Sequence, residues 1–407
     1  MVDLDWVAAP IGIDARRWVT RQGCRTMLIA VHTIASCHRL LDILDLVEAD
    51  SRVQTVFTVA PDVFNAGVAT HLQDLGALVI PWKQAVRETF DLALAAAHGG
   101  LHELHAPVVL VAHGAGRGAL VRPPDRDSPP AGESTVYGLD ASRLVRDGRV
   151  VPAALVLSHD NERAVLSRQC PDALSRAVVA GDICFDRLVA SLPARDRYRR
   201  GLHIGTGQKL VVVSSTWGAD GLFGGVPDLL PLLMDQLPRH RFRVAALLHP
   251  AVWGAHGRRQ VAAWTRDCRD AGMILAGPAD DWRAFLAAAD YLIGDRGSVT
   301  AYGAAVGLPV LCIPTSAAGR TAPSSPHSLV LRTAGRLDLA RPLEHQVRSA
   351  RQVDPRLVAG AITARPGESG QLIRNLLYGI MRLAERGRHR GPAAVSVPDP
   401  RSRGAMP

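Results

Sequence analysis

The sequence has very little lysine, few aromatic residues and no long apolar run. Lysine occurs only at Lys83 and Lys209, so arginine supplies nearly all of the 47 basic residues, which outnumber 38 acidic ones and leave a net charge of +9. Such a charge favours an anionic partner, namely nucleic acid, an acidic membrane surface or a phosphate-bearing substrate. Aromatic residues make up 5% of the chain and do not alternate with the basic runs, so the stacking platform of a single-strand nucleic-acid binder is missing. We therefore expect no nucleic-acid partner.

Two further absences limit the cellular compartment and the kinds of site that we expect. No apolar run reaches the roughly 18 residues that span a bilayer, and charged residues interrupt the N-terminus where a signal peptide needs an apolar core. The six cysteines form no CxxC pair, which argues against both a zinc site and a disulfide framework. We expect a cytoplasmic protein with no transmembrane segment, buried free thiols, no metal and no cofactor.

The chain's 407 residues are about two to three times the usual length of one domain, which favours two domains. Strands alternate with helices twice along the chain, the pattern of parallel sheets covered on both faces. We expect strands at 26–32, 53–59, 107–112, 151–158, 209–217, 241–249, 291–294 and 309–313, with short apolar segments at 77–81 and 273–275. We expect helices at 37–47, 65–75, 91–104, 228–236, 257–271, 282–289 and 298–306.

This repetition predicts an α/β protein with two Rossmann-like, doubly wound domains facing a central cleft. The N-terminal domain would cover 1–172, a linker 173–208 and the C-terminal domain 209–370. A helix at 371–387 would pack across both domains. Residues 388–407 would form a disordered tail, and the Pro-rich segment 122–135 a surface loop.

In open α/β sheets, ligands bind beyond the carboxyl ends of the strands, so the loops that follow strands hold the candidate site residues. His113 follows the strand at 107–112 and begins the run His-Gly-Ala-Gly-Arg-Gly. Its glycines let a backbone approach a ligand closely, and a histidine there can act as a general base near neutral pH. A tight turn with a solvated histidine explains the same residues.

In the second half, hydroxyl residues end one strand and a histidine ends another. Ser214, Ser215 and Thr216 precede a Gly-rich loop that suits phosphate oxygens, although the lysine and the spacing of a P-loop are absent. His249, followed by proline, ends the next strand and is by itself typical of a structural turn.

A third loop, Asp295, Arg296, Gly297, Ser298 and Thr300, joins a buried strand to a helix. The first turn of a helix offers unpaired amides and a partial positive charge, the two hydroxyls can donate, and Arg296 can pair with phosphate. An ordinary N-cap at Asp295 or Ser298, worth about 1 kcal/mol, explains the same residues. The two roles are compatible.

The order of these segments resembles the CDP-glycerol glycerophosphotransferase family, the teichoic-acid polymerases and primases of GT-B fold. The matching pieces are Gly181-Asp182, Phe185-Asp186-Arg187-Leu188, Arg197-Tyr198-Arg199, KLVVVSSTW from Lys209, LLHP at 247–250 and ADYLIGDRGSVTAYGAAVGLPVL at 289–311. In the N-terminal half, His113-Gly114 is placed like the family's His-Gly-Thr motif.

The resemblance implies a metal-independent transferase of GT-B fold. It would move a glycerol-phosphate or glycosyl group from a nucleotide-activated donor such as CDP-glycerol to an acceptor hydroxyl in cell-envelope polymer synthesis. The acceptor would be a polyol phosphate or a glycan, carried by the inner face of the plasma membrane, to which the protein would attach peripherally. His113 would be the base, with Gly114, Gly116, Arg117 and His32 on the acceptor side. The donor nucleotide and its phosphates would be held by Ser214, Ser215, Thr216, His249, Asp295, Arg296, Gly297, Ser298 and Thr300.

The sequence departs from the family pattern in two places. The family's lysine after His-Gly-Thr-Pro is absent, with Arg117 the nearest cation, and Tyr-Ser-Ser is replaced by Arg296-Gly297-Ser298. Two alternatives stay open, the first because UDP-N-acetylglucosamine 2-epimerases share the Gly181-to-Asp186 signal and the second because of these departures. One is an enzyme like a UDP-sugar 2-epimerase, for which Asp160 and Asp295 are the available strand-end carboxylates. The other is a GT-B scaffold that has lost catalysis and serves in binding.

Overall fold

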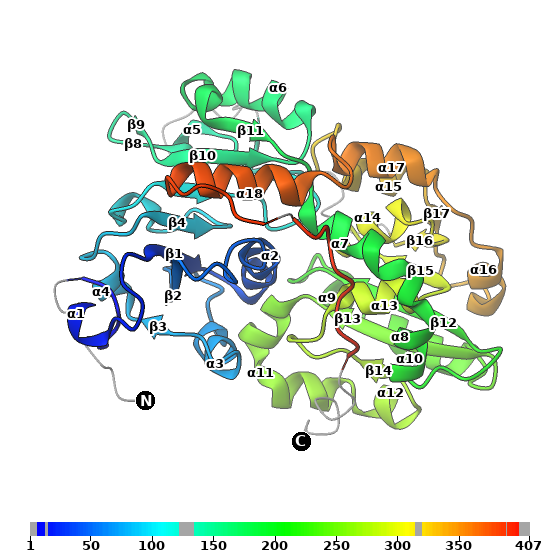
Figure 1. Ribbon diagram of the computed structural model, residues 1–407. Coiled ribbons are helices and arrows are strands. Elements are labelled where there is room, and N and C mark those ends of the chain that lie inside the picture. The colour runs from blue at the N-terminus through cyan, green and yellow to red at the C-terminus, as the bar shows by residue number, and fades with distance from the viewer. Residues whose placement is uncertain (1–5, 13–14, 122–133, 314–319, 388, 399–407) are drawn as a thin grey trace. The chain divides into compact units, whose positions relative to one another are not determined.

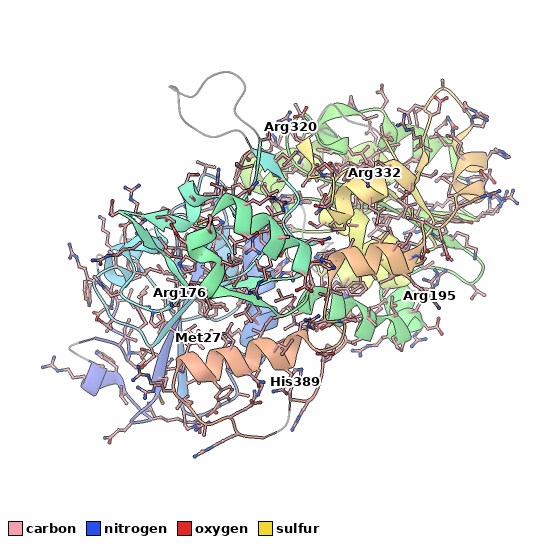
Figure 2. All side chains as sticks on the ribbon, turned by 90° about the horizontal axis from the view of Figure 1, so that it is seen from above. Met27, Arg176, Arg195, Arg320, Arg332 and His389 are labelled. Carbon is pink, nitrogen blue, oxygen red and sulfur yellow. The ribbon has the colours of Figure 1, made fainter. Side chains whose placement is uncertain are left out.

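The computed structural model describes residues 6–12, 15–121, 134–313, 320–387 and 389–398 (Figure 1). The chain forms two compact units. The first holds Met1–Arg117, Val121–Cys184 and Ala364–Gly391, and the second holds Gly118–Leu120, Phe185–Thr363 and Pro392–Pro407. The chain therefore returns to the first unit after building most of the second. Arginine side chains are exposed on both units, among them Arg176 on the first and Arg320 on the second (Figure 2).

The first unit is built on a seven-stranded sheet with the order β11-β10-β5-β4-β1-β2-β3, in which every pair is parallel. Its strands are β1 (Arg25–Val31), β2 (Val53–Val59), β3 (Val79–Ile80), β4 (Leu92–Ala95), β5 (Val108–Leu110), β10 (Pro152–Leu157) and β11 (Ala177–Val179). Its helices are α1 (Ala15–Trp18), α2 (Ile34–Leu44), α3 (Val68–Asp74), α4 (Trp82–Ala85), α5 (Ala141–Leu144), α6 (Asp160–Gln169) and α18 (Ser369–Ile380), with 3₁₀ turns η1 (Leu101–Glu103) and η2 (Pro171–Arg176). Short strands are β6 (Leu120–Val121), β7 (Thr135–Val136), β8 (Val145–Arg146) and β9 (Arg149–Val150).

Helix α18, from the far end of the chain, completes the core of the first unit. Its Ile373 and Leu377 are buried in the same cluster as Leu40 of α2 and Met27 of β1. Tyr378 adds a polar anchor, because its hydroxyl donates to Asp50 Oδ2 at 2.8 Å. Burying an aliphatic side chain contributes about 1.5–3 kcal/mol, so this helix is part of the folding unit.

The second unit is built on a six-stranded parallel sheet with the order β14-β13-β12-β15-β16-β17. Its strands are β12 (Lys209–Ser215), β13 (Phe242–Leu248), β14 (Ile274–Leu275), β15 (Tyr291–Gly294), β16 (Val310–Cys312) and β17 (Gly335–Arg336). Helix α7 (Ile183–Ser191) leads into it. The helices that follow are η3 (Leu192–Ala194), α8 (Arg195–Gly201), α9 (Leu222–Gly225), α10 (Leu229–Gln236), α11 (Pro250–Trp264), α12 (Arg266–Asp270), α13 (Trp282–Ala288), α14 (Ser298–Ala305), α15 (Pro326–Thr333), α16 (Leu343–Ser349) and α17 (Pro355–Ile362).

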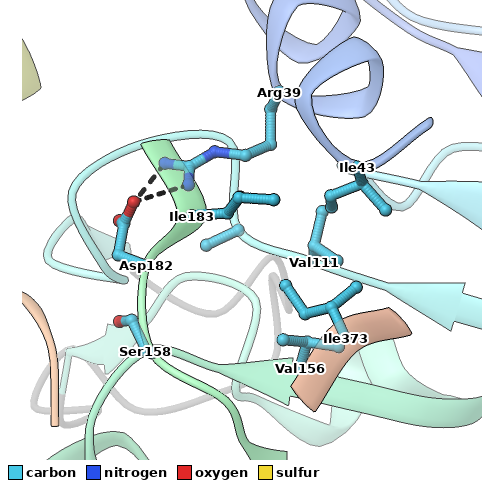
Figure 3. Close-up of a pocket in the computed structure, with 10 residues that line it drawn as sticks. Arg39, Ile43, Val111, Val156, Ser158, Asp182, Ile183 and Ile373 are labelled. Atoms are coloured by element: carbon cyan, nitrogen blue, oxygen red, sulfur yellow. Dashed lines mark hydrogen bonds and ion pairs between the residues drawn. The ribbon is translucent and has the colours of Figure 1, made fainter. Parts of the chain in front are cut away.

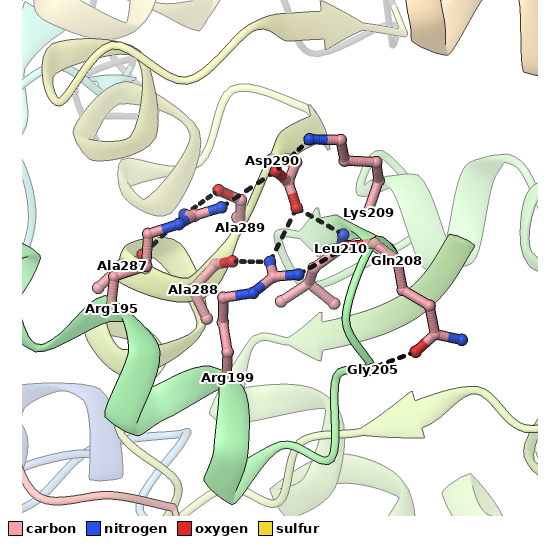
Figure 4. A network of polar contacts seen from close by, with 10 residues as sticks. All are labelled: Arg195, Arg199, Gly205, Gln208, Lys209, Leu210, Ala287, Ala288, Ala289 and Asp290. Carbon is pink, nitrogen blue, oxygen red and sulfur yellow. Dashed lines mark hydrogen bonds and ion pairs between the residues drawn. The ribbon is translucent and has the colours of Figure 1, made fainter. Parts of the chain in front are cut away.

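Two arginines of α8 hold the end of α13 (Figure 4). Arg195 Nη1 donates to the Ala287 and Ala289 carbonyls at 3.0 and 2.6 Å, and Arg199 Nη1 donates to the Ala288 carbonyl at 3.0 Å. Both also pair with Asp290, at 3.0 and 2.9 Å. The last carbonyls of a helix lack partners within it and favour cations, so these contacts fasten α13 and the entry to β15.

The predicted strands are observed, and one helix prediction is wrong. The helix predicted at 91–104 is instead β4 followed by η1. Its Leu- and Ala-rich run has high helix propensity, yet all four residues of β4 are buried in mid-sheet, and strands covered on both faces read as continuous apolar runs. The helical segment predicted at 257–271 is observed as the second part of α11 and as α12; α11 starts earlier, at Pro250, and has non-helical backbone at Gly257, where φ is +76°. Most of the loop predicted at 122–135 lies outside the described residues.

The tail prediction is wrong for residues 389–398, which have defined contacts. Val395 is 3% exposed, its amide donates to Ser191 Oγ at 3.1 Å, and its carbonyl accepts from Tyr198 Oη at 2.8 Å. A buried valine with both backbone groups bonded holds this segment on the second unit. Residue 388 and residues 399–407 lie outside the described part of the chain.

All six cysteines are free thiols, and five of them are buried. Burial raises the pKa of Cys37 and of Cys312 to about 12. In the described ranges, no helix is long and apolar enough to cross a membrane. In the same ranges, no three histidine, cysteine or carboxylate side chains are grouped so that they could bind a metal ion.

Candidate functional site

The carboxyl ends of the first unit's strands meet along one edge of its sheet, since the strands are parallel. The polar residues brought there are His32 after β1, His98 after β4, His113 after β5, Ser158 after β10 and Asp182 after β11. Three of these five were expected neither as base nor as acceptor-side residues. His98 was missed because its segment was interpreted as a helix.

His113 is held by its ring. Its Nδ1 lies 3.1 Å from the Ala96 carbonyl, and because a carbonyl only accepts, Nδ1 carries the hydrogen and Nε2 the lone pair. Desolvation by surrounding protein and the positive charges of Arg39 and Arg117 lower the pKa of His113. His113 is an exposed residue. At neutral pH, His113 therefore offers a basic nitrogen.

His32 and His98 are also neutral, chiefly because they are buried. The His32 ring is fully buried, its Nε2 lies 2.8 Å from the Gly99 carbonyl, and its Nδ1 has no hydrogen-bond partner among the described residues. Burial lowers the pKa of His32, and burial with the charges of Arg117 and Arg143 lowers the pKa of His98 to about 3. Both rings are therefore uncharged at neutral pH.

Arg117 is locked in place by Glu162 of α6. The Arg117 amide donates to Glu162 Oε1 at 2.6 Å, and its guanidinium lies 3.5 Å from Oε2 with the side chain only 6% exposed. Gly116 before it has φ +67°, and a Cβ there would lie 3.0 Å from Glu162 Oε1, so the loop needs glycine at this position. Arg117 Nη2 has no partner in the described part of the chain.

Arg39 of α2 ties two of these loops together (Figure 3). Its Nη1 and Nη2 donate to the two carboxylate oxygens of Asp182 at 2.8 and 3.3 Å, and Nη2 also donates to the Gly114 carbonyl at 2.8 Å. Both residues line a small pocket with Ser158. Its volume of about 20 Å³ holds roughly one water molecule.

In the second unit, Asp295 organises the loops after β12 and β15. Its Oδ2 accepts from the Thr216 amide and hydroxyl, both at 2.8 Å, and from the Leu222 amide at 3.0 Å. Its Oδ1 accepts from the Gly297 amide at 2.9 Å, and the residue is 1% exposed. Asp295 therefore shapes the N-terminus of α14 and has no oxygen turned to solvent.

The hydroxyls expected to bind phosphate are mostly used inside the protein. Ser215 Oγ donates to the Thr216 carbonyl at 2.7 Å and accepts from the Phe223 amide at 2.8 Å, and Thr216 Oγ1 donates to Asp295. Neither hydroxyl has a hydrogen left for a phosphate oxygen, so we assign both to holding the loop. Ser214 is buried within β12.

Thr300 is likewise turned inward. Its side chain is 1% exposed and lies against the backbone of Gly294, where a Cβ would meet Thr300 Oγ1 at 2.2 Å. We therefore assign its side chain to the contact between α14 and β15.

Three residues at the start of α14 and α15 form the remaining polar surface of this loop. Ser298 Oγ lies 3.3 Å from Nε2 of His327, and Arg296 is half-buried with no partner in the described ranges for its Nε. Burial and the charge of Arg296 lower the pKa of His327 to about 4. His327 was missed by sequence reasoning because it lies within a helix and far along the chain from Ser298.

His249 stands at the next strand end. Its amide donates to the Ser215 carbonyl at 3.1 Å, and its Nδ1 accepts from the Ala251 amide at 3.1 Å and so caps α11. Because Nδ1 accepts, Nε2 carries the hydrogen of the neutral ring. His249 thus lies beside Ser215, at the end of the neighbouring strand.

No protein-family model and no characterised protein matches the sequence. Solved structures do match. The wall teichoic acid polymerase TagF matches with a TM-score of 0.54 at 13% identity, over 88% of this chain and 89% of that one. S. aureus MnaA, solved with UDP, matches with a TM-score of 0.51 at 12% identity, over 91% of this chain and 100% of that one. UDP-GlcNAc 2-epimerase from Methanocaldococcus jannaschii matches with a TM-score of 0.51 at 11% identity, over 87% and 100%.

These likenesses concern the fold. Each match spans nearly the whole of both chains, and the two parallel sheets with flanking helices are those expected from the sequence. The chain has the α/β architecture of the GT-B fold.

Proposed function

We propose that the protein is a GT-B-type transferase that takes a glycerol-phosphate or glycosyl group from a nucleotide-activated donor and passes it to an acceptor hydroxyl. One observation carries the proposal: the buried carboxylate of Asp295 organises the first turn of α14 beside Arg296 and Ser298. The fold adds support, since TagF has been solved after soaking with CDPG and MnaA with UDP.

The donor's diphosphate binds at the start of α14. Amides of a helix's first turn and its partial positive charge favour an anion there, and Arg296 contributes a full positive charge. Ser298 and the Nε2–H of His249 supply further polar groups on the same unit. As the bond to the leaving nucleotide breaks, negative charge grows on the diphosphate, and these groups stabilise it.

The acceptor's hydroxyl is deprotonated by His113. Its Nε2 carries the lone pair because Nδ1 is bonded to the Ala96 carbonyl, and the lowered pKa keeps the ring neutral. A general base of this kind contributes about 10²- to 10⁴-fold to the rate. Gly114, Gly116, Arg117 and the neighbouring His32 form its surroundings on the acceptor side.

The finer assignments are also proposals. The acceptor is a polyol phosphate or a glycan of the cell envelope, which agrees with the wall teichoic acid polymerase among the structural neighbours. The protein works in the cytoplasm, attached peripherally to the inner face of the plasma membrane. Its excess of basic over acidic residues favours both an anionic substrate and an anionic surface.

A UDP-sugar 2-epimerase is the second candidate, because the match to a UDP-GlcNAc 2-epimerase covers the whole of that neighbour's chain. Its proton chemistry needs carboxylates at the site. Glu162, Asp182 and Asp295 are all taken up by hydrogen bonds within the protein, and Asp160 lies exposed on α6, 4.0 Å from Arg365. This pattern favours the transferase.

The test is calorimetric titration with CDP-glycerol, UDP-GlcNAc, CDP and UDP, followed by turnover assays with the donor that binds. His113→Ala should lower the rate about 10²- to 10⁴-fold and change donor affinity less than about twofold, with the exposed His102→Ala as its control. Full turnover by His113→Ala would exclude it as the base.

Replacing both Arg296 and Ser298 by alanine should weaken donor binding about 10- to 100-fold, from the loss of one or two charge-assisted bonds. The exposed Arg258→Ala is the control on the same unit. Unchanged affinity would remove the donor site from α14. Conversion of UDP-GlcNAc without an acceptor would favour the epimerase, and donor binding with no turnover would favour the inactive scaffold.

A further inference from the structure

We propose that Arg39 is a positioning residue for His113: fixed by Asp182, its guanidinium holds the Gly114 carbonyl and thereby sets the place of the His113 ring at the sheet edge. All four residues lie in the first unit. The inference rests on the proposed role of His113 as a base.

Burying the Arg39–Asp182 ion pair costs free energy. The two side chains are 7% and 1% exposed, and the apolar Ile43, Val111 and Ile183 line the same pocket (Figure 3). Removing two charges from water costs several kcal/mol per ion, and apolar side chains of similar volume often do as well or better for stability. Stability therefore gives no reason to keep an ion pair here.

What an apolar pair could not supply is the third hydrogen bond. Arg39 Nη2 donates to the Gly114 carbonyl at 2.8 Å while the same guanidinium grips both oxygens of Asp182. The fork of the guanidinium makes this geometry rigid, because rotation about one bond would break the others. The Gly114–Ala115 peptide, one residue beyond His113, is thus fixed to α2.

The His113 loop is consequently held at three points. The ring is bonded to the Ala96 carbonyl at 3.1 Å, the next carbonyl is bonded to Arg39, and the Arg117 amide is bonded to Glu162 at 2.6 Å. A base must keep its nitrogen within hydrogen-bond distance of the hydroxyl, and a displacement of about 1 Å costs up to 10²-fold in rate. Without the bond from Arg39 to the Gly114 carbonyl, the position of the His113 ring relative to the acceptor hydroxyl is less well defined.

Arg39 also acts on the charge state of His113. The charged groups facing the ring are Arg39 from α2, Arg117 from the same loop and Asp62 after β2, and the titratable His98 lies after β4. The two arginines lower the pKa of His113 and Asp62 raises it. Removing the charge of Arg39 therefore shifts the pKa of His113 upward.

Three variants separate these effects. Arg39→Met with Asp182→Asn removes both charges together, because Arg39→Met alone strands a buried carboxylate and endangers folding. Arg39→Lys keeps the charge and loses the fork. The control is Arg52→Met with Asp50→Asn, which removes another partly buried pair of the same unit at the opposite, amino-terminal end of the strands.

The measurements are kcat and donor KM, together with NMR titration of the His113 ring, whose signals are assigned by their absence in His113→Gln. In the Arg39→Met, Asp182→Asn variant we expect kcat to fall about 10- to 100-fold and donor KM to change less than about twofold. The pKa of His113 should stay close to the wild-type value, because the removed charges of Arg39 and Asp182 oppose each other. In Arg39→Lys we expect a lower kcat with the pKa of His113 unchanged. The control should match the wild type in kcat and in the His113 titration.

Wild-type kcat in the folded Arg39→Met, Asp182→Asn variant, with His113→Gln inactive, would overturn the positioning role. A different result would refute the proposed function alone: full activity in His113→Gln. The two failures are distinguishable, because His113→Gln tests the base by itself, whereas the double variant tests Arg39 once His113 is known to be needed.

Discussion

Replacement of Asp295 is the sharpest test of how the second unit holds its loops. The carboxylate accepts four hydrogen bonds from three residues, at 2.8, 2.8, 3.0 and 2.9 Å. Asp295→Ala removes every one of these acceptors. Leu222 is buried, so its amide stays without a partner, whereas the Thr216 and Gly297 amides are partly reached by water.

The magnitude follows from those bonds. A buried donor left unsatisfied costs about 1–3 kcal/mol, so Asp295→Ala should lower the free energy of unfolding by about 3–5 kcal/mol. Asp295→Asn keeps one oxygen, which can take the place of Oδ2, and turns its NH₂ toward the Gly297 amide. We expect it to lose about 1–3 kcal/mol. For a unit of this size, these losses correspond to a fall in Tm of roughly 10 °C and roughly 5 °C.

Differential scanning calorimetry and urea denaturation at pH 7.5 measure the two losses. The control is Asp228→Ala, an exposed aspartate whose side chain makes no cap bond, with an expected change within about 0.5 kcal/mol. Donor affinity of Asp295→Asn should also fall, because the start of α14 loses its anchor. A loss in Asp295→Ala no larger than that of the control would refute the assignment of Asp295 as organiser of these loops.

Three further predictions concern other parts of the chain. His98 is neutral in the folded state down to a pKa of about 3 but protonates near pH 6.5 when unfolded, so stability present above pH 6.5 is lost toward pH 3 by about 1.4 kcal/mol per pH unit. In urea unfolding between pH 7.5 and 5, His98→Gln should reduce the dependence of the free energy of unfolding on pH by the contribution of one proton. An unchanged dependence would contradict this prediction. The alanine of Gly116→Ala has a positive φ and its Cβ lies 3.0 Å from a carboxylate oxygen, whereas the alanine of Gly148→Ala has φ +70° but its Cβ has no neighbouring atom. We expect Gly148→Ala to lower the free energy of unfolding by about 1 kcal/mol and Gly116→Ala to lower it clearly more. Equal losses would show that the contact with the carboxylate costs nothing. Deletion of residues 392–407 removes buried Val395 and its two backbone bonds and should cost about 3 kcal/mol, so an unchanged Tm would show that this segment adds nothing.

Much of the fold was predictable from the sequence because its signals are local. A buried parallel strand reads as an apolar run, and β1, β2, β12 and β15 were found this way. An apolar run does not identify a strand where a helix could have the same composition. The Leu-Ala run of β4 is compatible with helix and with strand, and only its place between β1 and β5 decides.

The candidate site was predictable as a set of loops and less so as a set of roles. His113, His249 and Arg296 stand at the strand ends where the sequence put them. Thr216, Thr300 and Asp295 were expected to face a ligand, but their side chains bond or pack within the protein. A polar residue after a strand serves a ligand or the loop equally well, and its sequence does not say which.

The two units of parallel sheet, with polar loops after the strands, follow from the order of residues alone, since hydrophobic periodicity depends only on neighbours along the chain. Which residues meet depends on how the chain folds in three dimensions. Arg39 and Asp182 are 143 positions apart, and Thr216 and Asp295 are 79 apart. Hydrogen bonds over such separations leave no pattern in the sequence, because folding, not spacing, brings the groups within 3 Å.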